Sequence, residues 1–332
     1  MFGFGRRPII GEMDYLKLLR VGRSRPDVEV SLRIVWWNTG LAALTQKLHQ
    51  AESNSEKVKG KKKIKGRIDE RNNLIWELAE KNDILVLGEY KNEFEIKRKI
   101  ATRNVWYRVK GITRRLDCID LNYEAGEKMK FHNFIIFDAS AVRCFPRSKM
   151  SMTCANVGSC SRTRRYRAYQ VVKFVHSAAS DFSFEIFVVH WNMRNFFEGE
   201  SRHQLRLKAA ERLLKRIEKK NGFPYKIVVG DFNNEPFEDG LYWLEGSRSQ
   251  SYVAEFGGLY NPFWRYLGLD KYTLHSPKNR EFMSQGAIFD HMLVNQAFLT
   301  AGSEWKICPS ILENQYELQV NDHNPVRLLL KR

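Results

Sequence analysis

The sequence predicts an α+β domain in which a large amount of β-sheet is covered by a few helices. Short apolar runs rich in Val, Ile, Phe and Trp recur along the chain and end in turn-forming residues, as β-strands do. Beyond a short helix expected at 12–20, only two segments carry apolar residues at helical spacing. No Gly/Ser/Pro-rich linker divides the chain, so we predict one domain over 31–332 after an N-terminal extension over 1–30.

The individual elements follow from these patterns. The predicted strands cover 32–37, 84–87, 131–137, 169–175, 184–189, 226–229, 288–294 and 327–330. The helices cover 69–82, with Leu74 and Leu78 on one face, and 201–220, where Leu205, Leu213 and Ile217 lie on one face with Ala209. We expect 169–175 and 184–189 to pair as antiparallel strands, and we expect 146–167 and 231–285 to be irregular.

Composition excludes several classes of protein. The chain has 332 residues, and its hydrophobic fraction of 43% is too high for an intrinsically disordered protein. No apolar run approaches the roughly 20 residues that cross a bilayer, so we expect no transmembrane segment. The N-terminus has no apolar stretch after its first positive charges, which predicts a cytoplasmic location. Five cysteines without a C-x-x-C pair argue against a zinc ribbon or a disulfide framework and predict reduced thiols.

The net charge of +17 is unevenly distributed. Residues 231–322 hold 13 Asp/Glu and 6 Lys/Arg, so the basic excess lies in the rest of the chain. This balance favours a polyanionic partner, either nucleic acid or an anionic lipid surface, and leaves carboxylates for a cation. Seven Lys/Arg fall within 57–67; that segment reads equally well as a solvated loop, a helix extension or a nucleic-acid clamp.

Polar residues lie within or next to six of the predicted strands, where a strand delivers side chains to a site. They are Asn38, Glu89, His190, Asp231 with Asn233, Asp290, and Asp322 with His323. One such residue is usually a turn former. Together they predict an oxygen-rich site for a hard divalent cation, Mg²⁺ or Mn²⁺, with imidazoles beside it.

In chain order, WWNTG, LGEY, VVHWN, GDFNNEP, FDHMLVN and NDHNPV resemble the motif series of the endonuclease/exonuclease/phosphatase superfamily. The resemblance runs from about residue 32 to 330 and implies a DNase-I-like fold, a four-layer αββα sandwich with two mixed β-sheets. Asn321 stands where the family usually has a serine. The disulfide and calcium features of the family's secreted DNases are not apparent.

The resemblance also implies a metal site and a general base. Glu89, helped by Asn38 and Asp322, would hold the divalent ion. Asp290 would orient His323 in one tautomer, and His323 would deprotonate the attacking water.

The remaining site residues would act on the nucleophile and the phosphate. Asp231 and Asn233 would position the nucleophile or a second ion, and Asp231 is the alternative general base. His190 and Arg167 would bind phosphate oxygens, because RAYQVVKF and the histidine after it are similar to an arrangement in pancreatic-type DNases. Asn192 is a further phosphate contact or a turn former.

These residues predict a Mg²⁺-dependent phosphodiesterase, foremost an endonuclease that hydrolyses DNA or RNA by water attack. The same site would also serve a phosphoinositide or inositol-phosphate phosphatase, or a sphingomyelinase-like phosphodiesterase. A nucleic-acid-binding protein without activity is the third hypothesis, and the retained metal and base residues argue against it.

Overall fold

The computed structural model shows how the chain folds around the predicted strands. It describes residues 29–52, 58–90, 93–121, 132–145, 149–156, 163–191, 199–219, 222–242, 244, 246–247, 249–267, 269, 271–274, 287–300, 303, 305–312 and 323–332. The predicted extension over 1–30 falls almost entirely outside these ranges and stays a prediction.

Within the part of the chain that the structure describes, the first sheet has six strands. In spatial order they are β13 (Lys306–Ile311), β14 (Val326–Lys331), β1 (Ser31–Asn38), β2 (Ile84–Gly88), β4 (Phe134–Asp138) and β3 (Leu116–Asp120). The pair β1–β2 is parallel and the other pairs are antiparallel, so the sheet is mixed.

The second sheet has eight strands among the described residues and is also mixed. Its order is β10 (Gly246–Ser247), β11 (Leu259–Tyr260), β12 (Asp290–Asn295), β9 (Tyr225–Asp231), β8 (Ser183–His190), β7 (Thr163–His176) and β5 (Val142–Cys144), and β6 (Lys149–Asn156) also pairs with β7. Strands β8 and β9 are parallel, and β7 and β8 form the predicted antiparallel pair.

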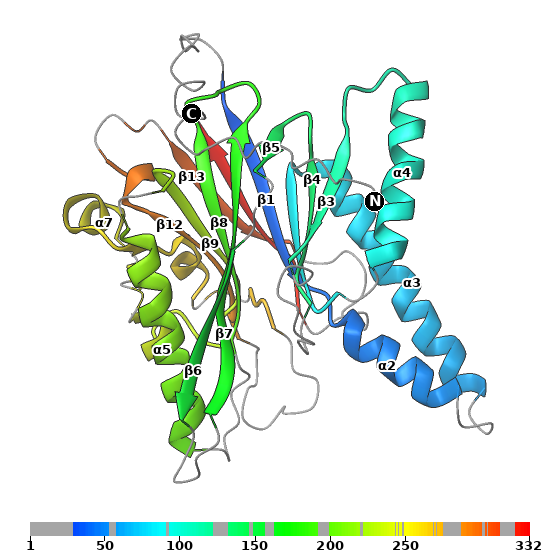
Figure 1. The fold of residues 1–332 in the computed structure, drawn as a ribbon, viewed down its shortest axis with the longest axis horizontal. Coiled ribbons are helices and arrows are strands. Elements are labelled where there is room, and N and C mark those ends of the chain that lie inside the picture. Colours follow the sequence, from blue (N-terminus) through cyan, green and yellow to red (C-terminus); the bar gives the residue numbers. More distant parts are fainter. Residues whose placement is uncertain are drawn as a thin grey trace, which may run out of the picture.

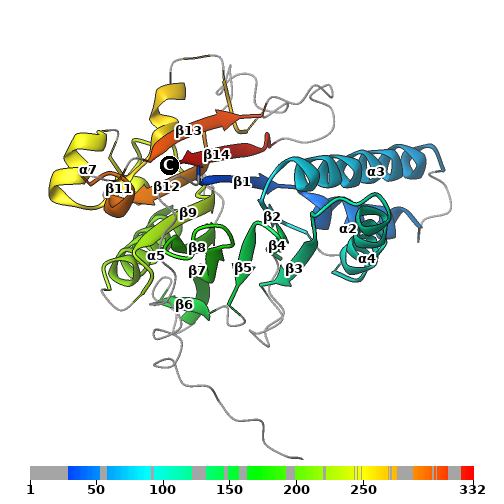
Figure 2. The same cartoon turned by 90° about the horizontal axis from the view of Figure 1, so that it is seen from above.

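Helices cover the outer faces of the two sheets. The six-stranded sheet packs against α3 (Val58–Lys81) and α4 (Glu93–Val109), and α2 (Leu41–Glu52) lies beside α3. The eight-stranded sheet packs against α5 (Gly199–Ile217). Short elements α6 (Asp239–Tyr242), α7 (Gln250–Phe256), η3 (Pro262–Tyr266) and η4 (Gln296–Phe298) complete the fold. Figures 1 and 2 show the two sheets facing each other between these helices, which confirms the αββα sandwich.

The alternation of side chains along the strands divides the core into three layers. In β1, Ile34 and Trp36 enter the core between the sheets, whereas Val35 and Trp37 pack under α3 and α4. In β9, Val229 enters the inter-sheet core and its neighbour Val228 packs under α5. Because successive residues of a strand point to opposite faces, both sheets are apolar on both faces, as a four-layer structure requires.

Several sequence predictions differ from the structure. The segment 146–167 is largely strand, because β6 and the start of β7 form a long hairpin despite their polar composition. The expected irregular stretch 231–285 contains α6, α7, η3 and two short strands. Helix α3 begins well before residue 69, so the lysine-rich segment is a helix extension where the structure describes it. Helices α2 and α4 and strands β3 and β13 were not predicted.

Helix α4 shows why some helices cannot be predicted from the spacing of apolar residues. It buries Ile96, Ile100 and Tyr107 but exposes Phe94 and Val109, so its apolar residues do not lie on one face. Cys308 is an exposed free thiol, and the predicted reduced state of the other cysteines stays a prediction. Within the described residues, no helix is long and apolar enough to cross a membrane.

Candidate active site

Four of the predicted site residues lie at one end of the inter-sheet layer. Asn38 is the last residue of β1, His190 of β8 and Asp231 of β9, and Asp290 begins the antiparallel strand β12. His190 pairs with Asp231, and Asp231 pairs with Asp290, in the register of the second sheet. Each lies an even number of residues from an inter-sheet core residue such as Trp36, so the period of two carries all four side chains between the sheets.

A buried carboxylate orients His323. Asp290 is fully buried and accepts hydrogen bonds from Trp36 Nε1 at 2.7 Å and from His323 Nδ1 at 2.8 Å. The backbone carbonyl of His323 accepts a further bond from Trp37 Nε1 at 3.1 Å. Because Nδ1 carries the proton shared with Asp290, Nε2 of the neutral ring is an acceptor, and it lies 3.9 Å from Asp231 Oδ2.

Asp231 occupies the centre of the site. Its Oδ2 accepts from Asn38 Nδ2 at 3.1 Å, and its Oδ1 accepts from the backbone N–H of Asn233 at 2.8 Å. Burial, and then the nearby Asp290 carboxylate, raise the pKa of Asp231 to about 7, although His323 and the two hydrogen bonds act in the opposite direction. Asp231 is therefore a carboxylate that exchanges protons near neutral pH.

The backbone after Asp231 is held in an unusual conformation. Asn233 has a φ of 49°, and its side-chain Nδ2 donates to the carbonyl of Trp191 at 2.8 Å. Before Asp231, a Cβ on Gly230 would lie 2.0 Å from the carbonyl oxygen of Val189, so only glycine fits. The GDFN motif therefore combines a close strand contact with a left-handed turn that brings the Asn233 N–H to Asp231.

Glu89 lies at the edge of the site in a second left-handed turn. Its φ is 53°, which is rare for glutamate, and its Oε1 lies 3.6 Å from His190 Nε2. His190 Nε2 also lies 3.9 Å from Asp231 Oδ2. Burial, followed by the charges of Arg167 and His323, lowers the pKa of His190 to about 3. His190 is therefore a neutral imidazole in this arrangement.

A β-bulge turns Arg167 toward the site. Tyr169 pairs with Ser151 and Arg167 pairs with Met152, so Ala168 is an extra residue in β7. Without it, the alternation from the inward-facing Gln170 would place Arg167 on the α5 side of the sheet. Instead Arg167 is buried and close enough to lower the pKa of His190.

The structure thus brings together Asn38, Glu89, Arg167, His190, Asp231, Asn233, Asp290 and His323. Asn192 and Asp322 lie outside the described residues. Oxygen-bearing side chains from Asn38, Glu89 and Asp231 converge on this region, which suits a hard cation. Asp231, Asp290 and His323 also offer ligand atoms within 4.8 Å of one another. Asp290, however, already accepts a hydrogen bond at each oxygen.

Sequence reasoning missed the residues that hold this site in place. The two tryptophans before Asn38 anchor Asp290 and the backbone of His323. Thr273 Oγ1 accepts from the backbone N–H of Asp290 at 3.0 Å. The consecutive tryptophans directly before a site residue were the available signal, because buried Trp N–H groups need acceptors.

His291 is a buried histidine with a structural role. Its Nε2 lies 3.0 Å from the carbonyl oxygen of Asn234, which can only accept, so Nε2 is the protonated nitrogen. Its Nδ1 then accepts from Asn261 Nδ2 at 3.4 Å. Burial lowers the pKa of His291 to about 4. His291 therefore supports the loop that follows Asp231.

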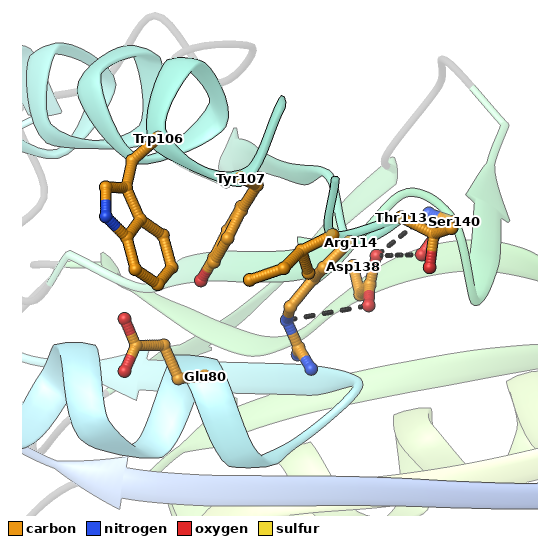
Figure 3. A pocket seen from close by; sticks show the side chains of 8 residues that line it. Glu80, Trp106, Tyr107, Thr113, Arg114, Asp138 and Ser140 are labelled. Carbon is orange, nitrogen blue, oxygen red and sulfur yellow. Dashed lines mark hydrogen bonds and ion pairs between the residues drawn. The ribbon is translucent and has the colours of Figure 1, made fainter. Parts of the chain in front are cut away.

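A cavity of about 450 Å³ lies elsewhere, between the C-terminal part of α4, the end of α3 and the turn after β4. Figure 3 shows Trp106 and Tyr107 above Glu80, with Arg114 beside Asp138. Asp138 accepts from Ser140 and lies 3.5 Å from Arg114 Nε. Since β4 runs antiparallel to β2, Asp138 marks the opposite end of the sheet from Glu89, and this cavity is separate from the candidate site.

Comparison with known proteins identifies the fold. No family model and no curated protein sequence matches the chain. Among solved structures, an endonuclease/exonuclease/phosphatase from Bacteroides vulgatus has a TM-score of 0.56 at 15% identity, covering 91% of this chain and 99% of that one. The human Nocturnin catalytic domain with bound sulfate gives 0.51 at 15% identity, covering 91% and 96%. D. rerio TDP2 with a single-strand DNA product gives 0.50 at 13% identity, covering 90% and 98%. The DNase-I-like fold implied by the motifs, a four-layer αββα sandwich, is thereby confirmed.

Proposed function

We propose that this protein is a divalent-cation-dependent phosphodiesterase, and specifically an endonuclease that hydrolyses DNA or RNA by water attack. The observation that carries the proposal is the buried Trp36–Asp290–His323 chain, whose second imidazole nitrogen, Nε2, lies 3.9 Å from Asp231 Oδ2. This is the arrangement of a general base held in one tautomer. Its surroundings, rich in carboxylate and imidazole groups, suit phosphoryl chemistry.

His323 is the proposed general base. Its Nε2 accepts a proton from the attacking water as the oxygen of that water bonds to phosphorus and the bond to the leaving oxygen breaks. Asp231 orients the water from the other side. Because its pKa lies near 7, Asp231 is the second candidate for the base, and the two roles are separable by mutation.

Glu89 and Asn38 are the proposed cation ligands, with Asp322 as a further ligand. The left-handed backbone at Glu89 fits this role, because strained conformations of non-glycine residues cluster at functional sites. The cation, Mg²⁺ or Mn²⁺, would supply neutralisation of charge on the phosphate and on the leaving oxygen.

His190 and Arg167 are the proposed phosphate-binding residues, with Asn192 as a further contact, whereas Asn233 is proposed to position the nucleophile or a second ion together with Asp231. His190 is neutral and donates one hydrogen bond, whereas the Arg167 guanidinium brings the positive charge. The bulge at Ala168 supports the assignment of Arg167, since bulges often re-aim a side chain next to a site.

A nucleic-acid substrate is favoured by the net charge of +17 and by the charge distribution. One similar structure, that of D. rerio TDP2, was solved with a single-strand DNA product. Phosphoinositides are also polyanions, so the same positive charge would favour them as substrates. Hydrolysis of inositol phosphates or phospholipids is therefore the alternative function.

The decisive experiment is incubation of the pure protein with Mg²⁺ and four substrates: supercoiled plasmid, single-stranded DNA, RNA and phosphoinositides. An endonuclease converts the closed circular plasmid to nicked circles, which an exonuclease cannot do. His323→Ala and Asp231→Ala should each lose ~10²–10⁴ in rate, and EDTA should stop turnover. Turnover of the phosphoinositides alone would exclude the nuclease, and unchanged activity in both variants would exclude the proposed site.

A further inference from the structure

A basic helical hairpin projects from the sandwich next to the candidate site. Helix α2 begins three residues after Asn38, and α3 returns alongside it to the sheet. At the base of the hairpin, the backbone N–H of Ala42 donates to the carbonyl of Glu89 at 2.8 Å. Figures 1 and 2 show the far half of the hairpin reaching beyond the sheets. We call the segment Lys61–Arg67 of α3, which lies in this half, the basic arm.

The basic arm lies at a defined distance from the site. Arg71 is buried at the base of the hairpin, and its Nη1 donates to the carbonyl of Thr39 at 2.6 Å, next to Asn38. Lys61 and Arg67 lie ten and four residues before Arg71. At 1.5 Å of rise per residue, the arm therefore extends ~6–15 Å beyond this anchor. Each strand of duplex DNA carries one phosphate per ~3.4 Å of helix axis, so along a duplex that lies parallel to the arm this length corresponds to about two to four nucleotides.

The arm presents charge and almost no apolar surface. Ile64 and Ile68 are half-buried, and Ile68 packs against the core beneath α3. Residues four apart share a helix face. Ile64 therefore lies on the same face as Ile68, which is the face turned toward the core. Lys62, Lys63 and Lys65 are exposed. Together with Lys61, they form no ion pair with any other residue that the structure describes.

The lysines of the basic arm do not stabilise helix α3 at the positions they occupy. The first turn of α3 contains no acidic residue, and its amino end is the positive end of the helix dipole. Lys61 and Lys65 are four residues apart and Lys62 and Lys65 three apart, so like charges repel on the helix surface. Positive charge is therefore concentrated at the less favourable end of the helix, an arrangement that a bound polyanion would relieve.

We propose that the basic arm binds the sugar–phosphate backbone of a nucleic-acid substrate, two to four nucleotides from the scissile phosphate. This inference rests on the proposed nuclease function. A bilayer is the less suitable occupant, because helices that lie in membrane interfaces need an exposed apolar face and the single isoleucine of the arm, Ile64, is half-buried. Contacts between lysines and phosphates fix position and affinity without reading sequence. The arm therefore sets substrate affinity and takes no part in bond cleavage.

The test is binding measured without catalysis. The full-length protein is titrated in EDTA into fluorescein-labelled single-stranded DNA, duplex DNA or RNA of about 30 nucleotides per strand. Fluorescence anisotropy is recorded from about 50 to 200 mM KCl. The arm variant carries Gln in place of Lys61, Lys62, Lys63 and Lys65. The matched control carries Gln at four exposed lysines remote from the site, Lys110, Lys219, Lys306 and Lys331. Both variants lose the same charge, and Gln retains the helix propensity of Lys.

The arm variant should bind at least about tenfold more weakly at 100 mM KCl. The slope of log affinity against log salt should fall by about 2–4, because each lost phosphate contact removes ~0.7–0.9. The control variant should stay within about threefold of the wild type. The double variant Lys62→Gln/Lys65→Gln should show about half the change in slope, which guards against a folding defect in the quadruple variant.

Vesicles containing phosphatidylserine are titrated in the same way. Three results would overturn the proposal: no nucleic-acid binding by the wild type, equal loss in the arm and control variants, or an arm variant that loses binding to the vesicles but not to nucleic acid. Activity separates this proposal from the proposed function. Hydrolysis of bis-p-nitrophenyl phosphate with Mg²⁺ should be unchanged in the arm variant, since that substrate is too small to reach the arm. If the wild type does not hydrolyse this compound or any nucleic acid, the proposed function fails, whereas the binding result still decides whether the arm holds a polyanion.

Discussion

Replacement of Asp290 by Asn should remove most of the activity while leaving the fold and substrate affinity intact. The carboxylate accepts from two donors, Trp36 Nε1 at 2.7 Å and His323 Nδ1 at 2.8 Å. An amide of the same shape has one acceptor oxygen and one NH₂ group. If its oxygen keeps the bond to Trp36, its NH₂ faces His323 Nδ1, which must then accept.

The consequence is a change of tautomer. With Nδ1 as acceptor, the proton of the neutral ring moves to Nε2, the atom that faces Asp231, and the ring can no longer take a proton from water. Loss of a positioned base costs ~10²–10⁴ in kcat. KM should change little, because Asp290 is fully buried and cannot touch the substrate.

The assay is hydrolysis of bis-p-nitrophenyl phosphate with Mg²⁺ across pH 5–9, with circular dichroism to confirm folding. Trp36→Phe is the matched control, since it removes the other hydrogen bond to Asp290 and leaves the tautomer of His323 unchanged. It should cost ~1–3 kcal/mol of stability from the unsatisfied buried oxygen and less than about tenfold in kcat. If Asp290→Asn kept kcat within about threefold while Asp231→Asn abolished it, Asp231 would be the base and the reasoning about His323 would be refuted.

Three further predictions concern stability. In EDTA at pH 8, Asp231→Asn should raise the melting temperature, because a folded-state pKa near 7 means that the buried carboxylate destabilises the fold as pH rises from 3.8 through 7; an unchanged or lower melting temperature would contradict this. The pKa of His291 is about 4 in the folded state against 6.5 when unfolded. The free energy of unfolding should therefore fall on the order of 3 kcal/mol as pH decreases from 6.5 through 4. Urea titrations should show that His291→Gln lacks this pH-dependent loss. Gly230→Ala should abolish folding or lower the melting temperature strongly, because its Cβ would lie 2.0 Å from the carbonyl oxygen of Val189, whereas Gly66→Ala in open space on α3 should stabilise by up to about 1 kcal/mol.

The sequence predicted the strands that are apolar on both faces. Short apolar runs rich in β-branched and aromatic residues, such as those of β1 and β9, are typical of buried strands. It also predicted α5, where one apolar face repeats every fourth residue. Polar strands such as β6 were missed, since their pairing with β7 comes from tertiary contact and leaves no periodic pattern in the chain.

The residues of the candidate site were likewise predicted only in part from the sequence. The polar residues near the strand ends were predictable because they recur at six apolar strands, whereas turn formation explains only single cases. Their partners were not, because Trp36 and Asp290 lie 254 residues apart and meet only through the packing of the two sheets. The inward orientation of Arg167 depends on a single extra residue, Ala168, which has no signature in the sequence.

The site is held together by the contact between the sheets more than by either sheet alone. Asn38 and Trp36 belong to β1, yet they bond to Asp231 in β9 and Asp290 in β12, and both hydrogen bonds cross the inter-sheet layer. A slip of β1 by one residue would turn both side chains to the outer face, beneath α3 and α4. The apolar alternation that fills the core therefore also fixes the base, its orienting carboxylate and the central Asp231 in one geometry. In this fold the stability of the inter-sheet core and the precision of the site have the same physical origin.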